Sequence, residues 1–99
     1  MGKKARRKPK RLAEKLVQIR TALGLSQSEM LRRLEVEDQI DYTAISKYEL
    51  GRNEPSLIIL LQYARAAGVS TDVLIDDELN LPARLPSAKK HESVRHRSR

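Results

Sequence analysis

The sequence predicts an all-α fold of five short helices, flanked by two basic tails that we expect to be disordered. Apolar side chains recur at the three- and four-residue spacing of a helical face. Serine or aspartate precedes four of these stretches and glycine follows three of them, which are the preferred residues at helix starts and ends. We therefore expect residues 10–81 to form one small helical domain.

Charge divides the chain into three parts. Of its 99 residues, 1–11 include seven Lys or Arg and no acid, and 82–99 include six against one acid. The middle, 12–81, has seven basic and twelve acidic residues. The tails, 1–9 and 82–99, have almost nothing to bury, so we expect disorder there. Basic tails usually meet a polyanion, most often nucleic acid, and the alternative is that they are simply solvated.

Composition argues against several kinds of protein. The chain has no cysteine, and its two histidines, His91 and His96, lie in the arginine-rich tail, so we expect no metal and no other cofactor. Without a histidine in the core or a glycine-rich phosphate loop, we expect no enzyme. No apolar run reaches the roughly 20 residues that span a bilayer. We expect no membrane partner and a cytoplasmic, nucleoid-associated location.

The first helix is expected to begin near Pro9 or Arg11 and to end at Leu23. No strong N-cap residue precedes it, so its first turn could fray. Gly24 follows as the residue that ends the helix. One apolar stripe is formed by Leu12, Leu16, Ile19 and Leu23.

Residues 25–51 contain two short helices, each with its own start signal. Ser26 and Glu29 form a capping box, and Asp41 is a second N-cap. On the third helix the predicted buried face is Ala44, Ile45 and Tyr48, which leaves Tyr42, Thr43, Ser46 and Lys47 exposed. A short helix with such a polar front could enter a DNA major groove, or these could be ordinary solvated residues.

Ser56 caps a fourth helix, which we expect to be central because it is the most apolar. Its expected apolar residues are Leu57, Ile58, Leu60, Leu61 and Ala64. Gly68 ends it, and Ser70 caps a short fifth helix. Three consecutive acids, 76–78, are unfavourable at a helix C-terminus, so that helix should stop early. Pro82 and Pro86 mark the start of the tail.

Several spaced motifs together resemble the DNA-binding domain of phage repressor, Cro and Xre-like regulators. They are Arg20, Ser26-Gln27, the run Ile45-Ser46-Lys47-Tyr48-Glu49-Leu50-Gly51, Pro55-Ser56 and Gly68-Val69-Ser70. The resemblance covers roughly residues 12–78. It implies a five-helix repressor-like DNA-binding domain with a helix-turn-helix, and a sequence-specific double-stranded DNA-binding transcriptional regulator. The third helix, about residues 42–50, would read the major groove.

The resemblance also assigns roles to particular residues. Tyr42, Thr43 and Lys47 fall on base-reading positions with Ser46 beside them, and Gln27, Arg52 and Asn53 on positions that contact the DNA backbone. Arg20 and Glu49 would form a structural ion pair between the first and third helices. A weak homodimer is a further expectation, through an exposed apolar patch of Val73, Leu74, Leu79 and Leu81.

The link between Leu34 and Ile45 departs from the family pattern. Glu35 stands where a glycine is usual, and the link is about four residues longer than usual. Either the second helix gains a turn or the loop bulges outward, with Ile40 packing back on the core. Its acids, Glu35, Glu37 and Asp38, would repel phosphate if they faced DNA. They keep open a second hypothesis, a protein-interaction module such as an antitoxin or adaptor with the same fold.

Overall fold

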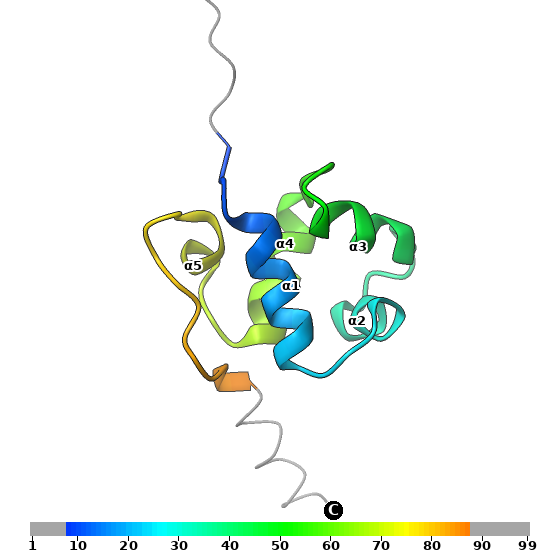
Figure 1. Cartoon of the computed structure of the whole chain (residues 1–99). Helices are drawn as coiled ribbons and strands as arrows, with labels where there is room; N and C mark the ends of the chain where they lie inside the picture. Colours follow the sequence, from blue (N-terminus) through cyan, green and yellow to red (C-terminus); the bar gives the residue numbers. More distant parts are fainter. Residues whose placement is uncertain (1–7, 88–99) are drawn as a thin grey trace, which may run out of the picture.

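The computed structural model describes residues 8–87, with five helices between residues 12 and 75 and helical backbone again at residues 86–87 (Figure 1). They are α1 (Leu12–Ala22), α2 (Gln27–Leu34), α3 (Tyr42–Glu49), α4 (Leu57–Ala67) and α5 (Thr71–Ile75). The all-α prediction is confirmed. In Figure 1, α1 and α4 lie in the middle, with α5 on one side and the α2–α3 pair on the other. Both central helices contact α5, α1 also packs on α3, and α4 also packs on α2.

Three helices begin with the caps that the sequence predicts. Ser26 Oγ accepts the Glu29 N–H at 3.1 Å, and the Glu29 carboxylate accepts the Ser26 N–H at 2.8 Å, so the capping box is complete. Asp41 Oδ1 accepts the Thr43 N–H at 3.0 Å, and Ser56 Oγ accepts the Ile59 N–H at 3.3 Å. Ser70 precedes α5 but makes no capping hydrogen bond through its side chain.

The core contains side chains from all five helices. Its fully buried members include Leu16, Ile19, Met30, Leu34, Ile45, Tyr63 and Leu74. The expected face of α4 is wrong at its first turn, because Leu57 is 81% exposed and Ile58 is 58% exposed. The buried stripe is instead Ile59, Leu60, Tyr63, Ala64 and Ala67, whose spacing of one, three, one and three follows one helical face.

The α2–α3 link is a loop and not an extension of α2. Glu35 ends α2 in the left-handed region, at φ 60° and ψ 42°. A turn follows, in which Val36 O accepts the N–H groups of Gln39 at 2.8 Å and Ile40 at 3.1 Å. Val36 is buried and Ile40 packs against the core, so two apolar side chains attach the loop to the core.

The folded part continues past the expected boundary at Leu81. Leu85 is buried in the core, and Ser87 Oγ donates to the carbonyl of Ala66. The prediction of disorder is therefore wrong for residues 82–87, because the apolar side chain of Leu85 is buried in the core. The predictions for residues 1–7 and 88–99, including both histidines, lie outside the described residues.

Candidate nucleic-acid interface

The back of α3 is joined to α1 and α2 through one carboxylate. Arg20 donates from Nε to Glu49 Oε2 at 2.7 Å and from Nη2 to Oε1 at 3.0 Å. Gln27 Nε2 donates to the same Oε1 at 3.1 Å, while Arg20 Nη1 reaches the Leu25 carbonyl at 3.0 Å. The side chain of Glu49 is 7% exposed and that of Arg20 22%. We call this contact of Arg20, Gln27 and Glu49 the Glu49 joint. Its bidentate ion pair and the additional amide hydrogen bond fix the end of α3 against two other helices.

Two tyrosines lie near this joint on its buried side. Tyr48 belongs to the core, and Tyr63 is fully buried on α4. The Tyr63 hydroxyl has no hydrogen-bond partner within residues 8–87. Burial raises the pKa of Tyr63 far above its ordinary value, so the hydroxyl stays neutral. Sequence reasoning missed Tyr63 because its ring completes an α4 stripe that starts at Ile59 and not at Leu57.

The front of α3 carries the polar residues that the sequence singles out. Tyr42 is 53% exposed, Thr43 and Lys47 are exposed, and Ser46 is half-buried. Ser46 is therefore less accessible than expected. The Thr43 hydroxyl donates to Asp41 Oδ1, which leaves its methyl group and its oxygen lone pairs available. That hydrogen bond lowers the pKa of Asp41, which stays charged beside the α3 N-terminus.

The loop after α3 turns back beside Lys47. The Lys47 carbonyl accepts the Arg52 N–H at 2.9 Å and the Asn53 N–H at 3.5 Å. Gly51 provides the positive φ of 75° that this turn requires. Both Arg52 and Asn53 are exposed. The structure thus brings Arg52 and Asn53 to the end of the same helix whose front carries Thr43 and Lys47.

The acidic link borders this front. A hollow of about 520 Å³ is lined by Thr43, Lys47 and Asn53 together with residues 37–41 and Ala44. Glu37, Asp38 and Asp41 are exposed there. Three carboxylates next to Lys47 disfavour phosphate at this edge, whereas Arg52 at the other end of α3 favours it. The front of α3 therefore has one acidic and one basic border.

A buried lysine on the opposite side of α1 was missed. Lys15 is fully buried, and its Nζ donates to the carbonyls of Val73 at 2.7 Å, Asp76 at 2.9 Å and Leu79 at 2.8 Å. It ties the C-terminal end of α5 to α1. The only signal in the sequence is its position three residues after Leu12 and four before Ile19, inside the apolar stripe.

The expected dimer patch is wrong in one member. Leu74 is fully buried, while Leu79 is exposed and Val73 and Leu81 are half-buried.

Among the described residues, no helix combines the length and apolar character needed to cross a membrane. Within the same range, His, Asp and Glu side chains form no group of three or more that could hold a metal ion.

The comparison with protein families agrees with this geometry. Residues 16–74 match the family HTH_3, described as helix-turn-helix, and the match covers more than half of the chain. A search for similar curated proteins found no match. The matched range contains the Glu49 joint, both helices of the α2–α3 pair and the loop that carries Arg52. The chain therefore belongs to HTH_3, the Xre/Cro/phage repressor-like helix-turn-helix family of DNA-binding regulators.

Proposed function

We propose that this chain is a sequence-specific transcriptional regulator in which α3 reads the major groove of double-stranded DNA. One observation carries the proposal. The back of α3 is fixed by the Arg20–Glu49 pair and by Ile45 and Tyr48 in the core, while its front is polar and exposed. A helix held rigidly from behind presents its front in one orientation, which base readout requires.

Each front residue has a chemical role in this proposal. The Lys47 ammonium donates to guanine O6 and N7, and the Thr43 methyl group contacts a thymine methyl group. The Tyr42 ring stacks on a sugar or donates its hydroxyl to a phosphate. Ser46, which is half-buried, has the smallest part.

Other residues position the domain on the DNA backbone. Arg52 and Asn53 hold phosphates beyond the end of α3, and contacts of this kind set register without reading sequence. Gln27 lies in the first turn of α2, where unpaired helix N–H groups favour a phosphate, and its amide also braces Glu49. Regulation would follow from occupancy, either by excluding polymerase or by recruiting it.

Binding to a duplex selected from random DNA, and to a scrambled duplex, tests the proposal. We expect Lys47→Ala to cost roughly 1–3 kcal/mol on the selected duplex and much less on the scrambled one. Arg65→Ala is a matched control, since Arg65 is exposed on α4 and hydrogen-bonds Gln62. It should change neither affinity. Equal weakening of both duplexes by Lys47→Ala would mean that α3 does not read bases.

A protein-interaction module, such as an antitoxin or adaptor, is the second candidate. The exposed apolar pair Leu57 and Ile58 favours it, because two large apolar side chains meet water at the start of α4. Sedimentation of the chain, with and without the selected duplex, tests the form of this candidate in which the pair binds a second copy of the chain. If that form holds, Leu57→Ser with Ile58→Ser abolishes self-association and leaves DNA binding unchanged. If the regulator proposal alone holds, the double variant sediments like the parent.

A further inference from the structure

Gln39 lies in the link between α2 and α3, on a turn that is attached to the core. Its N–H donates to the Val36 carbonyl at 2.8 Å, and the apolar side chains of Val36 and Ile40 pack against the core. These contacts use the backbone of Gln39 and leave its side chain exposed. Within residues 8–87, the side-chain amide has no hydrogen-bond partner. The turn therefore holds a glutamine in place with both its donor and its acceptor free.

Gln39 belongs to the same surface as the proposed base-reading residues of α3. It lines the hollow of about 520 Å³ together with Thr43, Lys47 and Asn53. Thr43 and Lys47 lie on the exposed front of α3, which we propose enters the major groove. That groove is about 12 Å wide and presents the edges of successive base pairs. Base edges that meet this hollow are therefore within reach of Gln39 as well as of Lys47.

The charges beside Gln39 decide which part of DNA its amide would meet. Glutamine binds phosphates as well as bases. Glu37 and Asp38 occupy the two central positions of the turn, and both are exposed. Their negative charges repel phosphate, whereas the amino groups of adenine and cytosine in the major groove are hydrogen-bond donors. The link therefore favours base edges over the DNA backbone as the partner of Gln39.

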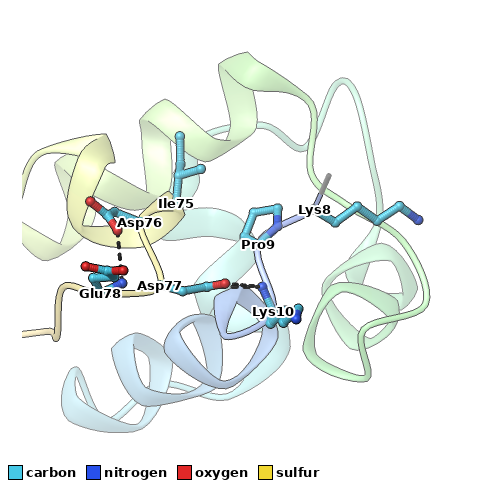
Figure 2. A pocket seen from close by; sticks show the side chains of 7 residues that line it. All are labelled: Lys8, Pro9, Lys10, Ile75, Asp76, Asp77 and Glu78. Atoms are coloured by element: carbon cyan, nitrogen blue, oxygen red, sulfur yellow. Dashed lines mark hydrogen bonds between the residues drawn. The ribbon is translucent and has the colours of Figure 1, made fainter. Parts of the chain in front are cut away.

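The acidic stretch after α5 provides a comparison, because the fold uses its carboxylates. Asp77 accepts the Lys10 N–H at 2.9 and 3.0 Å, which joins the segment after α5 to the start of α1 (Figure 2). Asp76 accepts the Glu78 N–H at 2.9 Å. By contrast, the exposed polar side chains of the turn at residues 37–39 make no such contact within residues 8–87. Folding therefore explains the polar side chains after α5 and leaves those of the turn available.

We propose that Gln39 is a specificity-determining residue that reads an adenine in the major groove, beside the base read by Lys47. This inference rests on the proposed function, because the link reaches the groove only if α3 enters it. A glutamine amide donates to adenine N7 and accepts from adenine N6 at the same time. Guanine and thymine present no amino donor in the major groove, and cytosine presents no N7 acceptor. The long α2–α3 link thereby extends the reading surface beyond α3.

Selection from random duplex DNA by the full-length chain, followed by affinity measurements, tests the assignment. We expect Gln39→Ala to lose the preference for adenine at one position and to keep the preference that Lys47 supplies. Its affinity should fall roughly 5- to 150-fold for the selected duplex and hardly at all for a scrambled one. Gln18→Ala is the matched control, because Gln18 is exposed on α1 and does not line the hollow. It should select the parent sequence.

A second variant and a modified base identify the atoms that pair. Gln39→Glu keeps an acceptor and loses the donor, so we expect the selected adenine to be exchanged for cytosine, whose N4 donates to a carboxylate. An adenine analogue with carbon in place of N7 should weaken binding by the parent and leave binding by Gln39→Ala unchanged. Adenine retained by Gln39→Glu, or equal weakening of both proteins by the analogue, would overturn the inference.

The failure of this inference can be distinguished from the failure of the proposed function. If Gln39→Ala selects the parent sequence while Lys47→Ala loses a preference, the inference falls and the proposed function stands. If Gln39→Ala weakens the selected and scrambled duplexes alike, Gln39 contacts the DNA backbone and its assignment to a base is wrong. If the parent chain selects no sequence, the proposed function falls and the inference falls with it.

Discussion

The two sides of α1 are held by different kinds of contact. On one side, α2 and α3 begin with caps two or three residues away, and they meet α1 at Glu49. On the other side, the polar contacts that Lys15 and Arg11 make with α5 and the segment after it join residues 58 to 69 positions apart. A short stretch of chain thus specifies the helix-turn-helix, whereas the α5 side forms only when the two ends of the domain meet.

Glu49→Ala should have the largest effect, because it removes the joint on the helix-turn-helix side. It leaves Arg20 without a counter-charge and the Gln27 amide without its acceptor. We expect a loss of about 3 kcal/mol in the free energy of unfolding, the lower end of the range for buried pairs, since Arg20 is 22% exposed. Thermal unfolding measures it. Glu29→Ala, which removes an exposed capping carboxylate, should cost only about 1 kcal/mol, and similar melting temperatures for both variants would contradict the role of the joint.

Lys15→Met examines the α5 side in the same way. The change keeps an apolar stem but removes the donor shared by the carbonyls of Val73, Asp76 and Leu79. We expect a loss of about 1–3 kcal/mol, measured by denaturant unfolding. Lys47→Met is the control on an exposed lysine and should stay within about 0.5 kcal/mol of the parent. If both variants unfold alike, the long-range contacts of Lys15 contribute nothing.

Two glycines with the same backbone conformation measure the packing of residues 82–87. Gly24 has φ +70° with nothing within 4 Å of an added Cβ, whereas at Gly68, with φ +79°, that Cβ would lie 2.7 Å from the Ser87 nitrogen. Alanine should cost about 1 kcal/mol at either position through backbone strain, and roughly 1 kcal/mol more at Gly68 through the clash. Ending the chain after Leu81 should make the two costs equal. Equal costs in the full-length chain would instead show that Ser87 does not pack there.

Glu35→Gly should have the smallest effect and the opposite sign. The left-handed conformation at Glu35 costs about 1 kcal/mol for a residue with a Cβ, and the greater chain entropy of glycine in the unfolded state offsets part of the relief. We expect a net gain of at most about 0.5 kcal/mol. Glu37→Gly has no positive φ to relieve and should lower stability. If Glu35→Gly lowered the free energy of unfolding as much as Glu37→Gly does, the left-handed backbone at Glu35 would have no energetic cost.

The same contrast explains which features of the fold could be predicted from the sequence. The helix starts at Ser26, Asp41 and Ser56 could be predicted because a cap and its target lie within three residues. The α4 face could not, because its run of apolar residues fits more than one stripe and only packing selects Ile59 over Ile58. The hydrogen bonds from the Lys10 and Arg11 N–H groups to the Asp77 carboxylate could not be predicted, because nothing near Leu12 indicates this distant partner.

For the candidate site, the helical period identified the exposed residues of α3. Tyr42, Thr43 and Lys47 lie on its exposed front because the core residues Ile45 and Tyr48 occupy the other face. The partial burial of Ser46 and the hydrogen bond from the Thr43 hydroxyl to Asp41 depend on local geometry that residue spacing does not specify. The acidic border was visible in the composition of the link, but its place beside Lys47 required the fold.

The most direct test of α3 as the reading element is to repeat the selection from random duplex DNA with Lys47→Ala. The parent chain should select a sequence with defined preferences at several positions. The variant should lose the preference at one position, where Lys47 donates to guanine, and keep the others. A selected sequence that is the same for both proteins, or one that loses every preference together, would contradict the assignment of Lys47 to a base.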